Sequence, residues 1–178
     1  CYDDYNPGTS ITLTATPSAG SRFGSWIDGP CIGSTVNTCM FNVNAPVTIE
    51  VEFVDLDTVT LNKAGAGTGT VTSAPAGINC GTGCNSQSAP FDDGTSVTLT
   101  AVAAAGSTFT GWSGAGCAGT GQCVINSLQS DQTVTATFAL AGTVTINKTG
   151  SGSANGTVTS TNPAGGISCG VDCSEIYS

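Results

Sequence analysis

The residues with the most obvious chemistry are the cysteines, most of which occur in close pairs. The chain of 178 residues contains 9 of them. Cysteines at short spacings, separated by Gly, Thr and Ser, are typical of a disulfide framework formed in an oxidising compartment. Local pairing is the simplest connectivity, and each short loop would then contribute about 2 to 3 kcal/mol to stability. The predicted pairs are Cys31 with Cys39, Cys80 with Cys84, Cys117 with Cys123, and Cys169 with Cys173.

A metal site is the alternative for the two closest pairs, at 80–84 and 169–173. Zinc sites usually combine C-x2-C or C-x4-C pairs with histidine or further cysteines. This chain has no histidine. We therefore expect disulfides here, and neither a metal nor another cofactor.

Cys1 is left over in this pairing scheme. It occupies the same repeat position as Cys84 and Cys173, so its expected role is inter-module, with the counterpart of Cys80 in a preceding repeat as its partner. An odd cysteine in an exported protein suggests pairing across such a boundary. Attachment of a lipid to an N-terminal cysteine is the alternative.

Paired acidic residues are the next candidates for chemistry, because they could bind Ca²⁺ or form a catalytic pair. They are Asp3-Asp4, Asp55 with Asp57, and Asp92-Asp93. A hard cation requires six or more oxygen ligands, and none of these clusters supplies them alone. A glycosidase pair would have to come from distant residues. We expect solvated turn acids, with 55–57 forming a short joint between repeats.

The net charge and the missing histidine exclude several function classes. Without imidazole, Ser-His-Asp and Cys-His catalysis and c-type haem attachment are excluded. The 3 basic and 12 acidic residues give a net charge of −9, which repels nucleic acid and anionic lipid. No apolar run approaches the ~20 residues of a membrane helix. We expect no enzymatic activity, no nucleic-acid partner and no membrane span.

Two lysines occupy matching repeat positions, Lys63 and Lys148. Either could form an intramolecular isopeptide bond with an asparagine, a linkage known from surface fibres. A polar lysine that closes a strand explains the matching positions equally well. The sequence leaves both interpretations open.

The elements that must position these residues are β-strands. Runs in which Thr or Ser alternates with Val, Ile, Leu or Ala have the period of two of half-buried strands. Glycine-rich segments between the runs, such as Asn155-Gly156, are typical of turns. The expected strands are 10–16, 47–53, 59–63, 96–102, 133–138 and 144–148. The predicted fold class is all-β.

These strands belong to a tandem repeat of about 85 residues. Residues 8–15 reappear as 94–101, and residues 58–63 reappear as 143–148. Self-similarity at a fixed period indicates an array of small modules. Three domains are expected. Residues 1–54 are the second half of a repeat, residues 57–140 are a complete repeat, and residues 143–178 are the first half of a repeat.

The two incomplete repeats are expected to complement each other. Residues 143–178, the tail, supply the first hairpin of a module, and residues 1–54, the head, supply the strands that follow it. A tail joined to a head therefore makes one complete module. An isolated half leaves open sheet edges, which are templates for added strands. Either the chain is a window from a longer array, or copies complete one another head to tail. Both arrangements give a long thread of modules.

The aromatic residues recur at equivalent positions and are expected to form the module core. A buried tryptophan contributes about 150 to 250 Å² of contact area, and these modules have few other large side chains. Exposed tryptophans that stack on sugar rings are the alternative. The predicted core residues are Phe23, Trp26, Phe53, Phe109, Trp112 and Phe138.

The order of motifs in the complete repeat resembles a known family. The motifs are Val59-Thr60-Leu61-Asn62-Lys63, Gly69-Thr70-Val71-Thr72-Ser73, 94–101, Gly106-Ser107-Thr108-Phe109-Thr110-Gly111-Trp112 and Val134-Thr135-Ala136-Thr137-Phe138. They resemble the divergent internalin-type B-repeat of bacterial cell-surface and secreted proteins. The resemblance implies a small β-rich module, strung in tandem as a stalk, spacer or adhesive segment, with no catalytic residue. Residues 26–30 depart from the Trp-Ser-Gly of the family.

Together these features predict a non-catalytic structural repeat of a bacterial extracellular fibre or surface stalk, assembled head to tail through complementary half-modules. The expected partners are copies of the chain or neighbouring repeats, and the expected location is extracellular or on the cell surface. An adhesin or glycan-binding module, with a surface glycan or protein receptor as its partner, is one alternative function. An accessory repeat of a secreted enzyme is the other.

Overall fold

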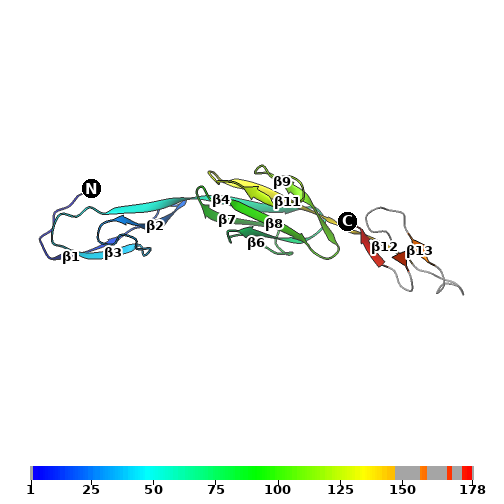
Figure 1. Ribbon diagram of the computed structural model, residues 1–178, viewed down its shortest axis with the longest axis horizontal. Coiled ribbons are helices and arrows are strands. Elements are labelled where there is room, and N and C mark those ends of the chain that lie inside the picture. Colours follow the sequence, from blue (N-terminus) through cyan, green and yellow to red (C-terminus); the bar gives the residue numbers. More distant parts are fainter. Residues whose placement is uncertain (1, 147–156, 160–167, 170–173, 178) are drawn as a thin grey trace. The chain divides into compact units, whose positions relative to one another are not determined.

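The computed structural model describes residues 2–146, 157–159, 168–169 and 174–177, which form strands and turns without a helix (Figure 1). The expected all-β, disulfide-stapled fold class is confirmed. Among these residues there is no helix long and apolar enough to cross a membrane. The strands are β1 (Thr9–Thr14), β2 (Ser21–Asp28), β3 (Thr38–Val43), β4 (Glu50–Ala64), β5 (Gly69–Ala74), β6 (Asn79–Cys80), β7 (Ser86–Asp92), β8 (Val97–Ala103), β9 (Ser107–Ser113), β10 (Cys123–Ile125), β11 (Gln132–Leu140), β12 (Gly142–Thr145), β13 (Val158–Thr159), β14 (Ser168–Cys169) and β15 (Ser174–Tyr177).

Strand β4 corrects one expectation. It continues through 55–57, the segment that we expected to form a joint. The backbone of this segment is paired, because Leu56 N–H donates to Gly20 O at 2.8 Å and Asp93 N–H donates to Asp55 O at 2.9 Å. These hydrogen bonds satisfy the backbone in an extended conformation, so the strand does not break at acidic residues that favour turns elsewhere.

The chain divides into two compact units. The first consists of Cys1–Val59, Ala89–Val97 and Asn126–Gln132, and the second of Thr60–Ser88, Thr98–Ile125 and Thr133–Ser178. The first unit thus combines residues 1–56 with three segments of the complete repeat, 57–59, 89–97 and 126–132. Strand β4 contributes residues to both units.

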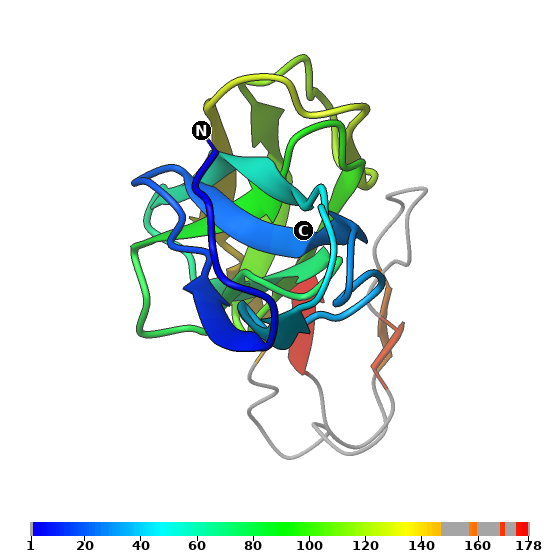
Figure 2. The same ribbon diagram turned by 90° about the vertical axis from the view of Figure 1, so that its left-hand side faces the viewer.

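Two strand pairs enclose a small core in the first unit, whose blue strands face the viewer in Figure 2. β1 pairs antiparallel with β3, and β2 pairs antiparallel with the first part of β4. Apolar residues on alternate positions of these strands point between the pairs. The buried residues are Ala15, Trp26 and Cys39, and Leu13, Phe23, Cys31, Phe41, Ile49 and Val51 pack against them.

The complete repeat is built from two sheets. One has the strand order β10-β8-β5-β6. In the other, β11 lies between β4 and β9, and β7 also pairs with β4. Alternate residues of these strands are buried, as the period of two in the sequence predicts. The buried residues include Val59, Leu61, Val71, Val97, Leu99, Val134, Ala136 and Phe138.

In the second unit the two sheets approach closely at Gly69 and Phe138. Gly69 begins β5, Phe138 lies in β11, and a Cβ atom at Gly69 would overlap the phenyl ring. Gly65 has a φ angle of +91°, and a Cβ atom there would overlap the carbonyl oxygen of Phe138. Glycine is therefore required at both positions, for space and, at Gly65, also for conformation.

The tail contains two short antiparallel pairs, β12 with β15 and β13 with β14. In the second pair Val158 lies opposite Cys169. The same register joins Val71 of β5 to Cys80 of β6 in the complete repeat. The β13–β14 pair of the tail therefore repeats the register of β5 with β6.

Candidate functional site

Three of the predicted cysteine pairs lie within the described residues, and each forms a disulfide. Their Cα–Cα distances of 5.7, 5.2 and 5.3 Å are normal for this bond. The bonds are Cys31–Cys39, Cys80–Cys84 and Cys117–Cys123. The predicted Cys169–Cys173 pair and the predicted inter-module role of Cys1 lie outside the described residues.

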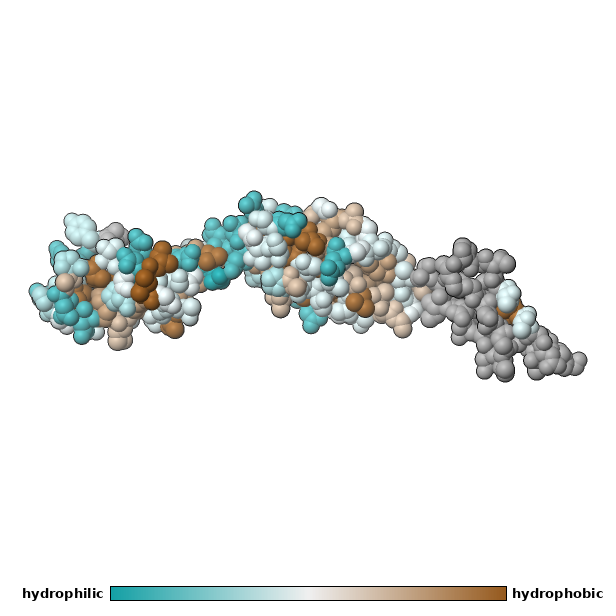
Figure 3. All heavy atoms as spheres, in the orientation of Figure 1, coloured by the Kyte–Doolittle hydropathy of each residue, from teal (hydrophilic) through white to brown (hydrophobic). Residues whose placement is uncertain are grey.

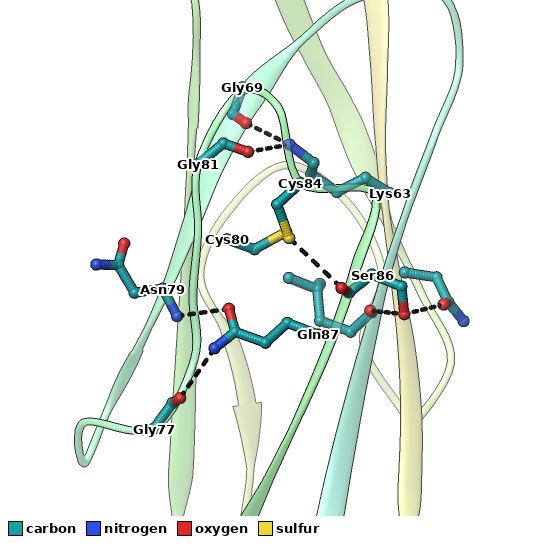
Figure 4. Close-up of a disulfide and its surroundings, with 11 residues drawn as sticks. Lys63, Gly69, Gly77, Asn79, Cys80, Gly81, Cys84, Ser86 and Gln87 are labelled. Carbon is teal, nitrogen blue, oxygen red and sulfur yellow. Dashed lines mark hydrogen bonds between the residues drawn. A yellow bond between two sulfur atoms is a disulfide. The ribbon is translucent and has the colours of Figure 1, made fainter.

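Lys63 lies beside the Cys80–Cys84 disulfide (Figure 4). Its Nζ donates hydrogen bonds to the carbonyl oxygens of Gly69 and Gly81, each at 2.7 Å. Burial lowers the pKa of the ammonium group, because desolvation disfavours its charged form. The charge also lies 5.9 Å from the ring centroid of Phe138, within range of a cation–π interaction. Lys63 therefore joins β4 to β5 and to the loop after β6, which favours the structural interpretation over an isopeptide bond.

Polar side chains of β7 bind the backbone of β4, of β6 and of the segment just before β6 (Figure 4). Ser86 Oγ donates to Leu61 O at 2.9 Å. Gln87 Oε1 accepts from Asn79 N–H at 3.0 Å, and Gln87 Nε2 donates to Gly77 O at 3.3 Å. These contacts satisfy backbone groups between strands. Lys63, Ser86 and Gln87 therefore stabilise the backbone around the Cys80–Cys84 disulfide. Among these three side chains, no nucleophile is hydrogen-bonded to a base.

Both tryptophans are buried. Trp26 is 3% exposed and Trp112 is 5% exposed. The indole N–H of Trp26 donates to Val36 O at 2.9 Å, and that of Trp112 donates to Gly121 O at 2.6 Å. Because each ring is enclosed and its N–H is satisfied, neither can stack on a sugar from solvent. This arrangement favours the core interpretation over the glycan platform.

Phenylalanines pack beside both tryptophans. Phe23 is partly buried, with its ring centroid 5.7 Å from that of Trp26. Phe109 is also partly buried, and its centroid lies 5.0 Å from Trp112 and 5.3 Å from Phe138. Tilted pairs at these separations add stabilisation beyond burial alone.

The expectation that Phe53 is a core residue requires correction. Phe53 is 43% exposed, whereas Phe138 at the same repeat position is 1% exposed. The ring of Phe138 packs against Gly69, which comes from the first half of its repeat. Residues 1–54 match the second half of a repeat, and no counterpart of Gly69 covers Phe53 within the described part of the chain.

An acidic side chain forms an ion pair in the first unit. Asp92 accepts from Arg22 Nε at 2.6 Å through Oδ1, and its Oδ2 contacts the Nη2 of the same guanidinium. The hydrogen bonds from Arg22 hold the pKa of Asp92 below its usual value. The pair links β2 of the first half-repeat to the end of β7.

Asp57 lies in a less favourable position. Its Oδ2 is buried and has no hydrogen-bond partner. Burial raises the pKa of this carboxyl group, and the negative charges of Asp93, Asp131 and Asp55 raise it further. Across the described parts of the chain, no three Cys, Asp or Glu residues are grouped to hold a metal ion.

Residues 1–54, which we call the first half-repeat because they come first in the chain, carry an open groove of about 1050 Å³. Figure 3 shows brown apolar side chains at the surface of this part of the molecule. Tyr2 and Tyr5 of the N-terminal segment also line the groove. Its apolar lining from β1, β3 and the approach to β4 includes Ile11, Leu13, Phe41, Val43, Val47 and Ile49.

The complete repeat shows what covers this face. Leu13 occupies the repeat position of Leu99, and Ile11 that of Val97. Leu99 and Val97 are fully buried, whereas Leu13 and Ile11 are only partly buried. The groove in residues 1–54 is therefore the face that, in the complete repeat, is covered by the strands of the N-terminal half of that repeat.

The strand pairs agree with this conclusion. In the complete repeat β8 has two neighbours, β10 and β5. Its equivalent β1 pairs with β3 alone among the described residues. In the second sheet, β11 lies between β9 and β4, while the equivalent first part of β4 pairs with β2. Each half-repeat thus contributes two strands to each sheet.

The sequence predicted open edges in the half-repeats but not this groove or the Arg22–Asp92 pair. The groove could have been found from the repeat itself, because Phe41 shares its position with Ile125, a buried residue of the complete repeat. The ion pair joins residues 70 positions apart. Nothing in the local pattern of the sequence indicates their contact.

Comparison with protein-family models finds two matches. Residues 1–56 and residues 58–142 each match the divergent InlB B-repeat domain. Comparisons with curated proteins and with solved structures find no match.

Proposed function

We propose that this chain, which belongs to the divergent InlB B-repeat family, is a non-catalytic structural repeat of a bacterial extracellular fibre or surface stalk. Copies assemble head to tail, with residues 143–178 of one copy completing residues 1–54 of the next. Residues 57–140 form a whole repeat between these junctions. The disulfides and the family are consistent with an extracellular location, since cytosolic thiols are kept reduced.

One observation carries this proposal. The head holds the strand pairs β1–β3 and β2–β4, and the tail holds β12–β15 and β13–β14. These correspond to the two halves from which both sheets of the complete repeat are built. Joining them would bury open backbone edges and apolar surface together, which favours association.

Light scattering and electron microscopy of the full chain test the proposal. The account predicts particles larger than a monomer that grow with concentration into threads. A chain ending at residue 142 keeps both family matches but cannot donate a tail, so it should stay monomeric. A full chain that remains monomeric at high concentration would contradict assembly through the half-repeats.

The alternative of an accessory repeat in a secreted enzyme makes a different prediction. In that case the repeats would lie beside a catalytic domain in one polypeptide, and the purified chain would not polymerise. The same light-scattering experiment therefore separates the two functions.

A further inference from the structure

We propose that the groove of the first half-repeat, defined above by its lining from Ile11 to Ile49, is a β-strand acceptor for residues 143–178 of a second copy, in a register that the complete repeat specifies. This inference rests on the proposed function. It adds which strand edge is used, which residues meet and which side chains fill the groove.

The acceptor edge is the side of β1 that faces away from β3. Ala15 N–H donates to Asn37 O at 2.8 Å, toward the β3 side. Successive residues of a strand direct their backbone groups to opposite edges. The N–H and C=O of Thr12 and Thr14 therefore face the other edge, where a further strand can bind them.

The complete repeat gives the register of that strand. In it β8 pairs with β5, and Thr100 lies opposite Thr72. Thr14 occupies the repeat position of Thr100, and Thr159 occupies that of Thr72. The structure thus assigns Thr159 of the donor to Thr14 of the acceptor, with β13 added antiparallel to β1.

The donor is already arranged for this role. β13 pairs with β14 in the register of β5 with β6, and the other edge of β13 has no partner among the described residues. Addition would extend β3–β1 to the four-stranded order β3-β1-β13-β14, the counterpart of β10-β8-β5-β6. Backbone hydrogen bonds supply affinity in such complexes, and alternate side chains supply specificity.

The groove fits the apolar face of this ribbon. Val71 of β5 and Leu61 of β4 are fully buried in the complete repeat. Val158 and Ile146 occupy their repeat positions in the tail. Val158 on β13 and Ile146, which directly follows β12, would then enter the groove beside Ile11 and Leu13. This match of pattern and register favours a second copy over an unrelated peptide.

Cross-linking between two variants of the full chain tests the register. One carries Thr14→Cys and the other Thr159→Cys, both in a Cys1→Ser background, so a bond between the introduced sulfurs is necessarily intermolecular. Both threonines are exposed, so these substitutions leave the apolar face intact. Mild oxidation should give a covalent dimer, and mass spectrometry should identify the linked peptides.

Thr12→Cys is the matched control for the acceptor. Thr12 is exposed on the same strand, but in the predicted register it lies diagonal to Thr159, at about 7 to 8 Å. That separation exceeds the reach of an unstrained disulfide. Cross-linking at Thr12 should therefore fall at least several-fold below that at Thr14. Equal yields at the two positions would overturn the register.

A substitution in the groove gives a second readout. Ile11 lines the groove but does not belong to the core cluster of the half-repeat. Ile11→Asp should reduce the yield of the Thr14–Thr159 cross-link by about tenfold or more, because a carboxylate would replace buried apolar surface. Thr12→Asp, on the opposite face of β1, should leave the yield nearly unchanged.

The outcomes separate this inference from the proposed function. Threads that form without the Thr14–Thr159 cross-link, or that tolerate Ile11→Asp, would overturn the acceptor site and leave a structural fibre standing. A specific cross-link without threads would support the site and contradict the fibre. Absence of both cross-links and threads would overturn both proposals.

Discussion

Trp112 is the residue whose loss should most affect the complete repeat. Its ring is buried and packs edge-to-face against Phe109, and its indole N–H donates a hydrogen bond to Gly121 O. Trp112→Ala should lower the free energy of unfolding by about 3 to 5 kcal/mol, as other large-to-small core substitutions do. Chemical denaturation followed by circular dichroism measures this change.

Val102→Ala is the control for that experiment, because Val102 is exposed on β8. Such a surface substitution usually changes stability by less than about 0.5 kcal/mol. If Trp112→Ala proved as mild as Val102→Ala, the ring would not be part of the core, and the glycan-platform alternative would regain support.

Substitution of Asp57 is expected to stabilise the fold, whereas substitution of Trp112 is expected to destabilise it. Its pKa is raised in the folded state, so folding is favoured when this carboxyl group is protonated and opposed when it is charged. Asp57→Asn should therefore raise the melting temperature at pH 7. The gain should shrink as the pH falls through the folded-state pKa and vanish below the unfolded-state value near 4.

Melting curves of both proteins between pH 3 and pH 8, roughly the window in which a raised aspartate pKa acts, measure this effect. Asp4→Asn is the matched control, since Asp4 is exposed and is not among the charges that raise the pKa of Asp57. A stabilisation by Asp57→Asn that persists undiminished at pH 3 would show that charge is not its cause.

The elements could be predicted largely from the sequence because one signal, the period of two, acts within each strand. It predicts β8 and β11 closely. The internal repeat also assigns a turn to Ala103-Ala104-Ala105, whose composition favours helix, and the structure places a turn at Ala105-Gly106. The continuity of β4 was not predictable in this way. It depends on hydrogen bonds from Leu56 and Asp93 to partners distant in sequence.

The candidate interface was predictable only in outline for a similar reason. Open edges follow from counting strands in each half-repeat, which the sequence permits. The groove depends on which apolar residues remain uncovered, and that became clear only when Leu13 and Phe53 could be compared with Leu99 and Phe138. Their residue types are those of a core in both halves.

The contact between the two sheets predicts a strict requirement at the start of β5. Gly69→Ala should destabilise the complete repeat by about 1 to 3 kcal/mol or more, because the added methyl group would overlap the buried ring of Phe138. The midpoint of urea denaturation measures the loss. Gly83→Ala is the control, since a Cβ atom there meets nothing within 4 Å. Equal effects of the two substitutions would contradict close packing of the sheets at Gly69.

In the proposed assembly, the chain acts as one repeat between two complementary halves. The same strand pairs are found within the complete repeat and in the two halves, so folding and assembly would use the same contacts. Strength along such a thread would come from shared sheets and a shared core rather than from surface ion pairs, which contribute little. The three disulfides found among the described residues would then restrict loops within each module, while Cys1 stays the predicted link between modules.

Hydrogen exchange at the outer edge of β1 tests whether the two half-repeats complete each other. The amides of Thr12 and Thr14 should exchange at least about tenfold more slowly in the assembled full chain than in the chain ending at residue 142, because only the full chain can supply the strand that binds them. Deuterium uptake by the peptide covering residues 9–15 measures the difference. Uptake in assembled material as fast as in the truncated chain would show that β1 keeps a free edge, and that the half-repeats do not complete each other.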